Sequence, residues 1–214
     1  MPRLLVLGSH NRKKLGELAE LLEPHGFALK TLADFPQAIA VEESGNTFAE
    51  NARLKASVQA RHLGQWVLGE DSGLSVDALG GAPGVYSARF SDLSAARRQE
   101  QSATDERNND LLLEKLMAVQ LEHRTAHYTC YAALSDPQGN IQAESEGICR
   151  GRILFERAGR GGFGYDPLFE IVECHQTFGE LSPAVKSVLS HRSRAIRLLV
   201  PQLVVLVKIG NWPG

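Results

Sequence analysis

Carboxylate side chains occur at two places in the chain where a metal or a phosphate could use them. Glu42 and Glu43 precede a predicted helix, and Glu70 and Asp71 follow an apolar run. Carboxylate oxygens from separate segments can hold Mg²⁺, which keeps several waters and takes few protein ligands. Asp71 is the best candidate, because an acid that ends a strand and precedes Ser72 lies where α/β sheets bind ligands. The alternative is that these acids are exposed loop residues.

A basic turn near the N-terminus could bind the negative charge of a phosphate. A buried strand that turns into a helix presents free N–H groups and the positive end of the helix dipole. The P-loop pattern is absent, so any phosphate site here is of another kind. Plain helix capping by Ser9 or Asn11 is the alternative. The polar residues of this turn, GSHNRKK (8–14), are Ser9, His10, Asn11, Arg12, Lys13 and Lys14.

A glycine-rich stretch, RGGFGYDPL (160–168), surrounds two aromatic residues. Glycine can adopt positive φ and lets the backbone approach a ligand closely. Phe163 and Tyr165 supply flat apolar faces. Two interpretations fit this pattern, and they differ in what the rings cover. Either the aromatic residues of a tight loop fill the core, or they form a shelf for a planar ring such as a purine.

A third polar stretch, KSVLSHR (186–192), contains Lys186, His191 and Arg192. These side chains could contact phosphate or base edges, and arginine can do so through two parallel hydrogen bonds. A structural histidine within a solvated basic face is the alternative. A basic turn, a set of carboxylates and an aromatic glycine loop together indicate a nucleoside triphosphate with Mg²⁺. These residues by themselves leave the reaction open.

The first third of the chain predicts two strands with a helix between them. RLLVLG (3–8) and FALKT (27–31) are short apolar runs typical of buried strands. Between them, leucines recur at helical spacing from Asn11 onward, and Gly26 is a suitable C-terminal stop.

A second helix is predicted from a capping box. Thr47 and Glu50 have the spacing in which each side chain caps the backbone of the other, and Gly64 marks the end of the helix. We therefore assign Glu50 to capping rather than to a metal. WVLG (66–69) and LSVDAL (74–79) predict two buried strands on either side of the acidic pair.

The remaining elements are a helical region, a hairpin and a final helix. Residues 92–119 are mostly helical in pattern, as one helix or as two pieces, and residues 124–151 predict a hairpin around a DPQGN turn. Pro183 follows a serine and can open a helical turn. A last helix starts near Ser190, and Pro201 is expected to kink or split it. The fold class is therefore mixed α/β.

Length and composition restrict the class of protein. The 214 residues, 43% of them hydrophobic, suit one sizeable globular domain or two lobes that share a cleft. The net charge of −2 and the lack of a basic stripe argue against nucleic-acid binding. No apolar run could span a bilayer, and the start does not resemble a signal peptide. Three widely spaced cysteines without a CxxC pattern favour a reducing cytoplasm.

With these motifs in order, the sequence resembles the Ham1/RdgB family of inosine triphosphate pyrophosphatases. The similarity extends from about Arg3 to Leu199, and several independent motifs contribute to it. They are SHN..K (9–14), SGNTFAENARLKA (44–56), DSGLSVDALGGAPGVYSAR (71–89), GGFGYDPLF (161–169) and SHR (190–192).

The resemblance implies an elongated α/β fold with a mixed, twisted sheet flanked by helices. It also implies a single domain, 1–214, whose two lobes surround a central nucleotide cleft, and a cytoplasmic homodimer. The implied activity is Mg²⁺-dependent hydrolysis of deaminated purine nucleoside triphosphates (XTP, ITP and dITP) to the monophosphate and pyrophosphate.

The resemblance also implies roles for individual residues. Glu43 and Asp71 would hold Mg²⁺, and Asp71 would accept the proton. Substrate would be bound by Ser9, His10, Asn11, Arg12, Lys13, Lys14, Lys55, Ser72, Phe163, Gly164, Tyr165, Asp166, Lys186, His191 and Arg192. The chain departs from the family pattern at Glu70, where many relatives have aspartate, and at Ala184-Val185, which lacks the usual acidic residue.

Two other functions are alternatives to this one. A Maf-type nucleotide pyrophosphatase cleaves the same bond, but GGFGYD and SHR favour the purine family. A non-enzymatic nucleotide-binding module would keep the basic turn and the aromatic loop but would not need Glu43 and Asp71.

Overall fold

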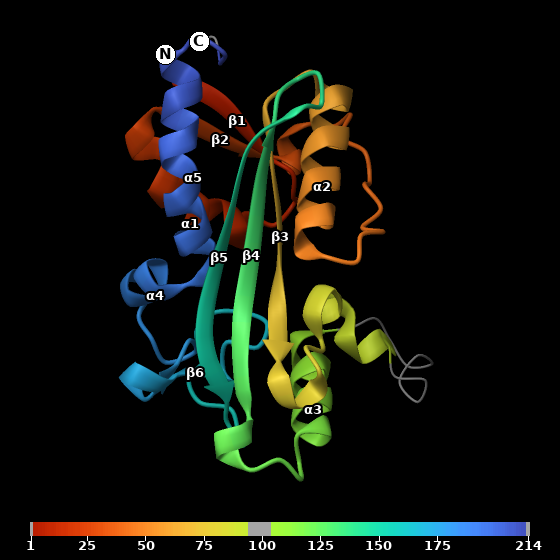
Figure 1. Cartoon of the computed structure of the whole chain (residues 1–214), viewed down its shortest axis with the longest axis vertical. Helices are drawn as coiled ribbons and strands as arrows, with labels where there is room; N and C mark the ends of the chain where they lie inside the picture. The colour runs from red at the N-terminus through yellow and green to blue at the C-terminus, as the bar shows by residue number, and fades with distance from the viewer. Residues whose placement is uncertain (1, 94–103, 213–214) are drawn as a thin grey trace. The chain divides into compact units, whose positions relative to one another are not determined.

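The computed structural model describes residues 2–93 and 104–212, and the side chains of Arg12 and Lys13 lie outside the described part. The strands are β1 (Arg3–Leu7), β2 (Phe27–Thr31), β3 (Val67–Val76), β4 (Thr125–Ser135), β5 (Ile141–Ile153), β6 (Phe169–Ile171) and β7 (Gln176–Thr177). The helices are α1 (Arg12–Leu22), α2 (Phe48–Leu63), α3 (Asp105–Lys115), α4 (Pro183–Leu189) and α5 (His191–Lys208) (Figure 1).

The seven strands form one mixed sheet in the order β2-β1-β3-β4-β5-β6-β7. β1 pairs in parallel with β2 and with β3, whereas β6 pairs antiparallel with β5 and with β7. The register of the first pair aligns Arg3 with Phe27 and Leu7 with Thr31. The prediction of a mixed sheet with helices is therefore confirmed. In the described part of the chain, every helix is too short or too polar to cross a membrane.

Capping residues set the ends of the helices where the sequence predicts them. Thr47 caps α2 by accepting a hydrogen bond from the Glu50 N–H, and Gly64 ends this helix with left-handed φ. Asn11 precedes α1, and Gly26 closes the short turn that follows it. Glycine suits these helix ends because left-handed backbone carries no Cβ penalty there.

Three predicted elements differ from the structure. The two strands expected around the acidic pair are one continuous strand, β3, because Glu70 and Asp71 keep extended backbone while ion pairs satisfy their carboxylates. α5 is not split at Pro201, since buried residues before and after it, such as Leu199 and Leu203, pack in one core. Of the helical region predicted over 92–119, α3 is present, and residues 94–103 lie outside the described residues.

The chain divides into two compact units, and the residues of β3, β4 and β5 are shared between them. Unit 1 comprises Met1–Asp71, Cys130–Gly147 and His191–Gly214, and unit 2 comprises Ser72–Thr129 and Ile148–Ser190. The single nucleotide cleft and the single-domain organisation stay predictions.

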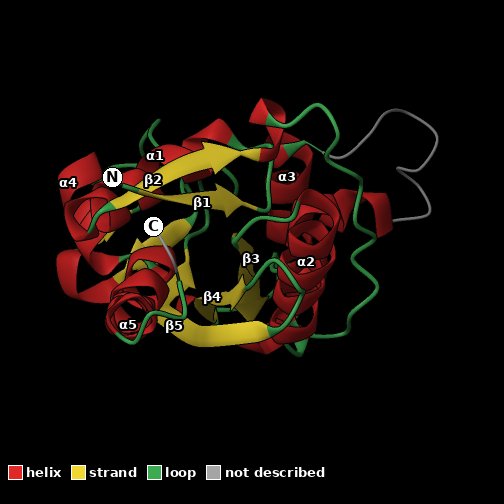
Figure 2. Ribbon diagram, turned by 90° about the horizontal axis from the view of Figure 1, so that it is seen from above, coloured by secondary structure: helices red, strands yellow, loops and turns green. Residues whose placement is uncertain are grey.

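In unit 1, helices cover both faces of the strands (Figure 2). Side chains of a strand alternate between its two faces. Leu5 and Leu7 accordingly pack with α1 and α5, while Val6 packs on the opposite face with Ala60 of α2. Figure 1 shows α1 and α5 side by side. β1 and the first half of β3 are therefore held in a three-layer core.

Unit 2 has its own core, in which aromatic residues predominate. Tyr128 packs edge-on against Phe169 with ring centroids 4.7 Å apart, and Phe169 stacks on Phe178 at 5.4 Å. Leu112 of α3 and Leu116, which directly follows this helix, belong to the same cluster. α3 is thus fixed against the strands by its apolar face.

Small residues let α2 approach β3 closely. A Cβ placed on Gly69 would lie 2.2 Å from the Ala52 carbonyl oxygen and 2.6 Å from the Ala56 nitrogen. Only glycine fits between these backbone atoms. This close approach brings Asn51 and Lys55, one helical turn apart, against Asp71 in the middle of β3.

Candidate active site

In unit 1, one lysine ammonium joins two carboxylates from separate segments. The Lys55 Nζ donates to Asp71 Oδ1 at 2.7 Å and to Glu43 Oε1 at 3.3 Å. The Asn51 Nδ2 donates to Asp71 Oδ2 at 3.2 Å, so both oxygens of Asp71 are occupied. Helix α2 supplies both donors, because residues 51 and 55 share one helical face.

Burial and charge act in opposite directions on this pair. Burial raises the pKa of Asp71 above its ordinary value, although the neighbouring Lys55 ammonium lowers it. Burial by itself would lower the pKa of Lys55, but Asp71 and Glu43 outweigh this effect and raise the pKa. The lysine is thus kept protonated beside a carboxylate of increased basicity.

The donor set of Glu43 and Asp71 fits Mg²⁺. The two residues come from a loop and from a strand, and both reach the same ammonium. Within the described residues no group of three or more His, Cys, Asp or Glu could hold a metal. Mg²⁺ nevertheless requires only one or two carboxylates, because waters and substrate phosphates complete its octahedron.

Of the other acids, Glu42 is exposed, and Glu50 caps α2. The Glu50 Oε2 accepts from the Asn46 N–H at 2.6 Å and from the Thr47 N–H at 3.2 Å. The assignment of Glu50 to capping is confirmed.

Glu70 lies in a buried ionic network rather than with Asp71. Its carboxylate accepts from the Lys14 Nζ at 2.6 Å and from the Arg192 Nη2 at 3.2 Å. The Arg192 guanidinium also contacts Glu17 at 2.5 Å and is only 2% exposed. Cys130 adds a thiol contact to Glu70 at 3.3 Å. Both basic side chains are thus oriented by Glu70.

The basic turn lies between β1 and α1, as predicted. The Ser9 Oγ accepts from the Asn11 N–H at 3.1 Å, and the Asn11 Oδ1 accepts from the Lys14 N–H at 3.3 Å. The capping alternative therefore holds for Asn11. His10 is exposed. The predicted contacts of the Arg12 and Lys13 side chains lie outside the described residues.

In unit 2, Asp166 organises the glycine loop. Its Oδ2 accepts from the Phe163 N–H at 2.8 Å and from the Lys186 Nζ at 2.7 Å. The Lys186 ammonium lies 4.7 Å from the centroid of the Phe163 ring. Gly162 has φ +77°, and a Cβ there would lie 2.0 Å from Asp166 Oδ2. The predicted site residues Phe163, Asp166 and Lys186 are thus adjacent.

The two aromatic residues of this loop have different environments. Tyr165 is 3% exposed, and its hydroxyl donates to the Ser87 carbonyl at 2.8 Å. Phe163 is half-buried. The core-filling interpretation therefore holds for Tyr165, and the shelf for a planar ring stays a prediction for Phe163.

Gly164, which lies between these aromatics, has φ +63°. Its N–H donates to Asp105 Oδ2 at 2.8 Å, and its carbonyl accepts from the Asn109 Nδ2 at 3.0 Å. Sequence reasoning missed both α3 residues. The one indication of them in the sequence was the polar stretch DERNND (105–110), which lies inside a predicted helix.

The remaining predicted residues lie at the ends of segments. Ser72, half-buried, is the first residue of unit 2, and the buried His191 opens α5 in unit 1. Unit 1 thus contains the basic turn, Glu43, Asp71, Lys55, His191 and Arg192. Unit 2 contains Ser72, Lys186 and the glycine loop.

Comparison with known proteins gives consistent matches. The model of the Ham1 family matches residues 5–202. A Rhodopirellula baltica protein named dITP/XTP pyrophosphatase is 54% identical over 204 residues, which cover 95% of this chain and 94% of that protein. A Desulforamulus reducens protein of the same name is 48% identical, covering 90% and 92% of the two chains.

A solved structure has the same fold. The structure of a HAM1 protein from Coxiella burnetii superposes with a TM-score of 0.81 at 34% sequence identity. The match covers 97% of this chain and 99% of that one.

Proposed function

Because the chain belongs to the Ham1 family, we propose that it is a nucleoside triphosphate pyrophosphohydrolase that acts on XTP, ITP and dITP. The observation that carries this proposal is the identity, over nearly the whole chain, with proteins named dITP/XTP pyrophosphatase. The joining of Asp71 and Glu43 through Lys55 supports it, since a binding module would not need two carboxylates from separate segments beside one lysine.

In the proposed reaction, a water oxygen forms a bond to the α-phosphorus, and the bond from this phosphorus to the oxygen that bridges to the β-phosphorus breaks. The products are the monophosphate and pyrophosphate. Asp71 accepts the proton of the attacking water. The raised pKa of Asp71 suits this role, because a more basic carboxylate is a better proton acceptor. Asn51 and Lys55 hold the carboxylate in place.

Glu43 and Asp71 would hold Mg²⁺. When bound, this ion supplies positive charge to phosphate oxygens and lowers the pKa of water. Lys55 and Lys14 add fixed positive charge, and the N–H groups at the start of α1 can bind phosphate oxygens. In this proposal, unit 1 therefore binds the triphosphate end of the nucleotide.

The base end is assigned to the glycine loop of unit 2. Phe163 covers the purine ring, and stacking of this kind is worth about 1–3 kcal/mol. Hypoxanthine and xanthine carry a 6-oxo acceptor where adenine has an amine, so donors at this edge reject adenine by leaving polar groups unpaired. Lys186 is the candidate donor in unit 2.

Pyrophosphate release from ITP, XTP, GTP and ATP, measured side by side with Mg²⁺, tests the proposal. We expect kcat/KM for ITP and XTP to exceed that for ATP by about 10² or more, and EDTA to abolish turnover. Comparable kcat/KM for ATP and ITP would refute selective base recognition. Binding of ITP without pyrophosphate release would favour a non-enzymatic module.

The proposal includes a homodimer in the cytoplasm. The thiols of the buried Cys130 and the exposed Cys174, neither of which forms a disulfide, support a reducing compartment. Light scattering coupled to gel filtration measures the mass, and the expected value is twice that of the 23.4 kDa chain.

A further inference from the structure

Two side chains of α3 hold both peptide groups that flank Gly164. The N–H of Gly164 belongs to the peptide plane shared with Phe163, and its carbonyl belongs to the plane shared with Tyr165. Asp105 accepts from the first at 2.8 Å, and Asn109 donates to the second at 3.0 Å. Residues 105 and 109 are one helical turn apart, so they lie on one face of α3.

Glycine makes this restraint necessary. Gly164 has no side chain to restrict rotation, and its φ of +63° is a conformation that other residues rarely adopt. Open space surrounds its Cβ position, so packing does not fix it either. Asp166 holds the Phe163 N–H, and the bonds of Gly164 to Asp105 and Asn109 then restrict how the Phe163 and Tyr165 peptide planes turn relative to each other.

The environment of Asn109 indicates that its amide is kept for this bond. The side chain is 1% exposed, and its Oδ1 has no hydrogen-bond partner among the described residues. A buried unsatisfied acceptor is costly, and an apolar side chain of similar volume would avoid the cost. The bond from Nδ2 to the Gly164 carbonyl is the interaction that an apolar residue could not make.

The neighbouring residue fixes α3 itself. The Asn108 Oδ1 accepts from the Ser91 N–H at 2.8 Å, and its Nδ2 donates to the Ser87 carbonyl at 3.3 Å. The Tyr165 hydroxyl donates to the same carbonyl at 2.8 Å. The Ser87 carbonyl thus links α3 to the glycine loop within unit 2.

We propose that Asp105 and Asn109 are positioning residues for base recognition, which orient the Phe163 ring through the two peptide groups of Gly164. This inference rests on the proposed function, since it assigns the purine to Phe163. It predicts that losing either bond weakens binding of the base without affecting binding of the phosphates. Neither residue touches the reacting atoms in this proposal.

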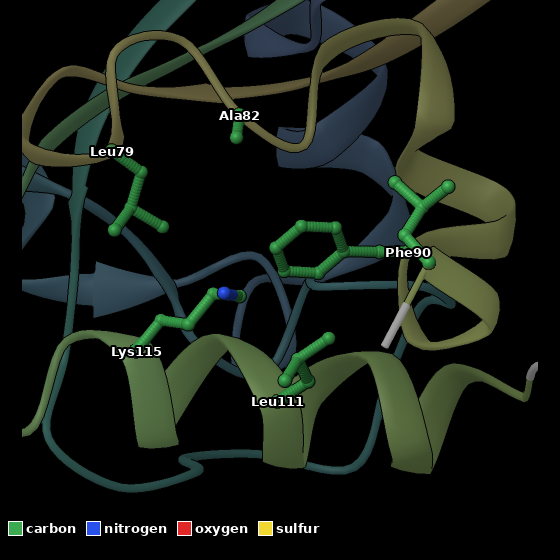
Figure 3. Close-up of a pocket in the computed structure, with 6 residues that line it drawn as sticks. Leu79, Ala82, Phe90, Leu111 and Lys115 are labelled. Carbon is green, nitrogen blue, oxygen red and sulfur yellow. The ribbon is translucent and has the colours of Figure 1, made fainter. Parts of the chain in front are cut away.

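Four variants distinguish a positioning role in base binding from a general loss of stability. D105A and N109A each remove one bond, whereas D105N keeps an acceptor for the Gly164 N–H. K115A is the matched control on the same helix. Lys115 faces a separate apolar pocket of about 300 Å³, formed with Leu79, Ala82, Phe90, Leu93 and Leu111 (Figure 3).

Dissociation constants for ITP and for pyrophosphate are measured by calorimetry in EDTA, which prevents turnover, and kcat is measured with Mg²⁺. D105A and N109A should raise the Kd for ITP about tenfold and leave the Kd for pyrophosphate within about twofold. D105N should recover most of the affinity, and K115A should match the wild type. Since Asp105 is exposed, D105A provides the test even if N109A is unstable.

An unchanged Kd for ITP in D105A, with an active wild type, would overturn the inference and leave the proposed function intact. Equal weakening of ITP and pyrophosphate would overturn it as well, because that result is expected from a structural role alone. A wild type that binds ITP and releases no pyrophosphate would overturn the proposed function, while the ratio of the two dissociation constants still decides on the positioning role.

Discussion

Asp71 is the residue that we propose as the proton acceptor, and both of its carboxylate oxygens accept hydrogen bonds. Its two carboxylate oxygens receive one ammonium and one amide donor, and Gly69 lets the helix that carries both donors come close enough. Burial raises the pKa of Asp71, although the Lys55 ammonium opposes this effect, so the carboxylate is more basic than usual. This basicity suits a proton acceptor that works beside a cation.

We expect Asp71→Asn to reduce kcat for ITP by about 10²–10⁴-fold, because an amide cannot take the proton from water. Binding of ITP should remain, since Lys55 and the basic turn are unchanged. Steady-state kinetics and calorimetry measure the two quantities. Glu122→Gln, an exposed acid in unit 2, is the control. A kcat near that of the wild type in Asp71→Asn would remove Asp71 from its role.

Phe163 and Tyr165 should respond differently to substitution. Phe163→Leu removes the ring and should weaken ITP binding by about 1–3 kcal/mol with little change in thermal stability. Tyr165→Phe keeps the ring but loses the hydrogen bond to Ser87, and should lower stability by about 1 kcal/mol with KM unchanged. The assignment would be wrong if Tyr165→Phe raised KM and Phe163→Leu did not.

Individual residues of the site were predictable to different degrees. Glu43, Asp71 and Lys55 belong to motifs whose residue types match their chemistry, and the structure brings the three together. The roles of Asp105 and Asn109 could not be read from the sequence, because polar residues in a helix usually face solvent. Their partner, the backbone of Gly164, is 55 residues away from Asn109.

At the scale of elements, local signals placed most strands and helices. Thr47 and Gly64 set the two ends of α2, whereas α1 ends at Leu22 and the predicted stop, Gly26, closes the 3-10 turn that follows it; these signals are local in sequence. The continuity of β3 was missed, because acids inside a strand are unfavourable unless distant partners such as Lys14 and Arg192 neutralise them. Such partners become visible only in three dimensions.

The packing of α2 on β3 gives a prediction for Gly69. Gly69→Ala would put a Cβ against the backbone of Ala52 and should cost about 1–3 kcal/mol or more. It should also lower kcat, because α2 carries Asn51 and Lys55. Gly16→Ala is the matched control: open space surrounds this helical glycine, so the change should stabilise by about 0.5–1 kcal/mol. Urea unfolding measures both.

The turn between β4 and β5 gives a pH-dependent prediction. Asp136 accepts hydrogen bonds from the Gln138 N–H at 2.9 Å, from the Asn140 N–H at 2.9 Å and from the Gln142 Nε2 at 2.7 Å. Burial by itself would raise the pKa of Asp136, but these bonds outweigh it, and the pKa is lowered. A lowered pKa in the folded state stabilises the protein above the unfolded pKa of about 3.9.

This stabilisation is lost as the pH falls through the native pKa of Asp136. We therefore expect Asp136→Asn to lower the free energy of unfolding by about 1 kcal/mol at pH 7 and by less at pH 3, because pH 3 lies below the unfolded pKa and the wild type has lost part of this stabilisation there. Urea unfolding at both pH values measures the difference. An equal loss at pH 3 and pH 7 would contradict the account.

At the scale of the whole molecule, the two ends of the described chain meet in unit 1. The Arg3 Nε donates to the Trp212 carbonyl at 3.1 Å, and the Trp212 ring stacks on Trp66 with centroids 4.3 Å apart. Phe27 contacts the same ring at 5.1 Å. The tail beyond α5, which no sequence motif explained, thus completes the core under β2. The stacking could not be predicted, because it joins segments separated by 146 positions.

The stacked pair has a practical consequence, because Trp66 and Trp212 are the two tryptophans of the chain. Tryptophan fluorescence, excited at a wavelength that tyrosine does not absorb, therefore reports on unit 1 alone. Unit 2 contains no tryptophan and does not contribute to this signal. If the units unfold together, emission and circular dichroism follow one denaturation curve. An emission change that precedes the loss of ellipticity would identify unit 1 as a separately melting body.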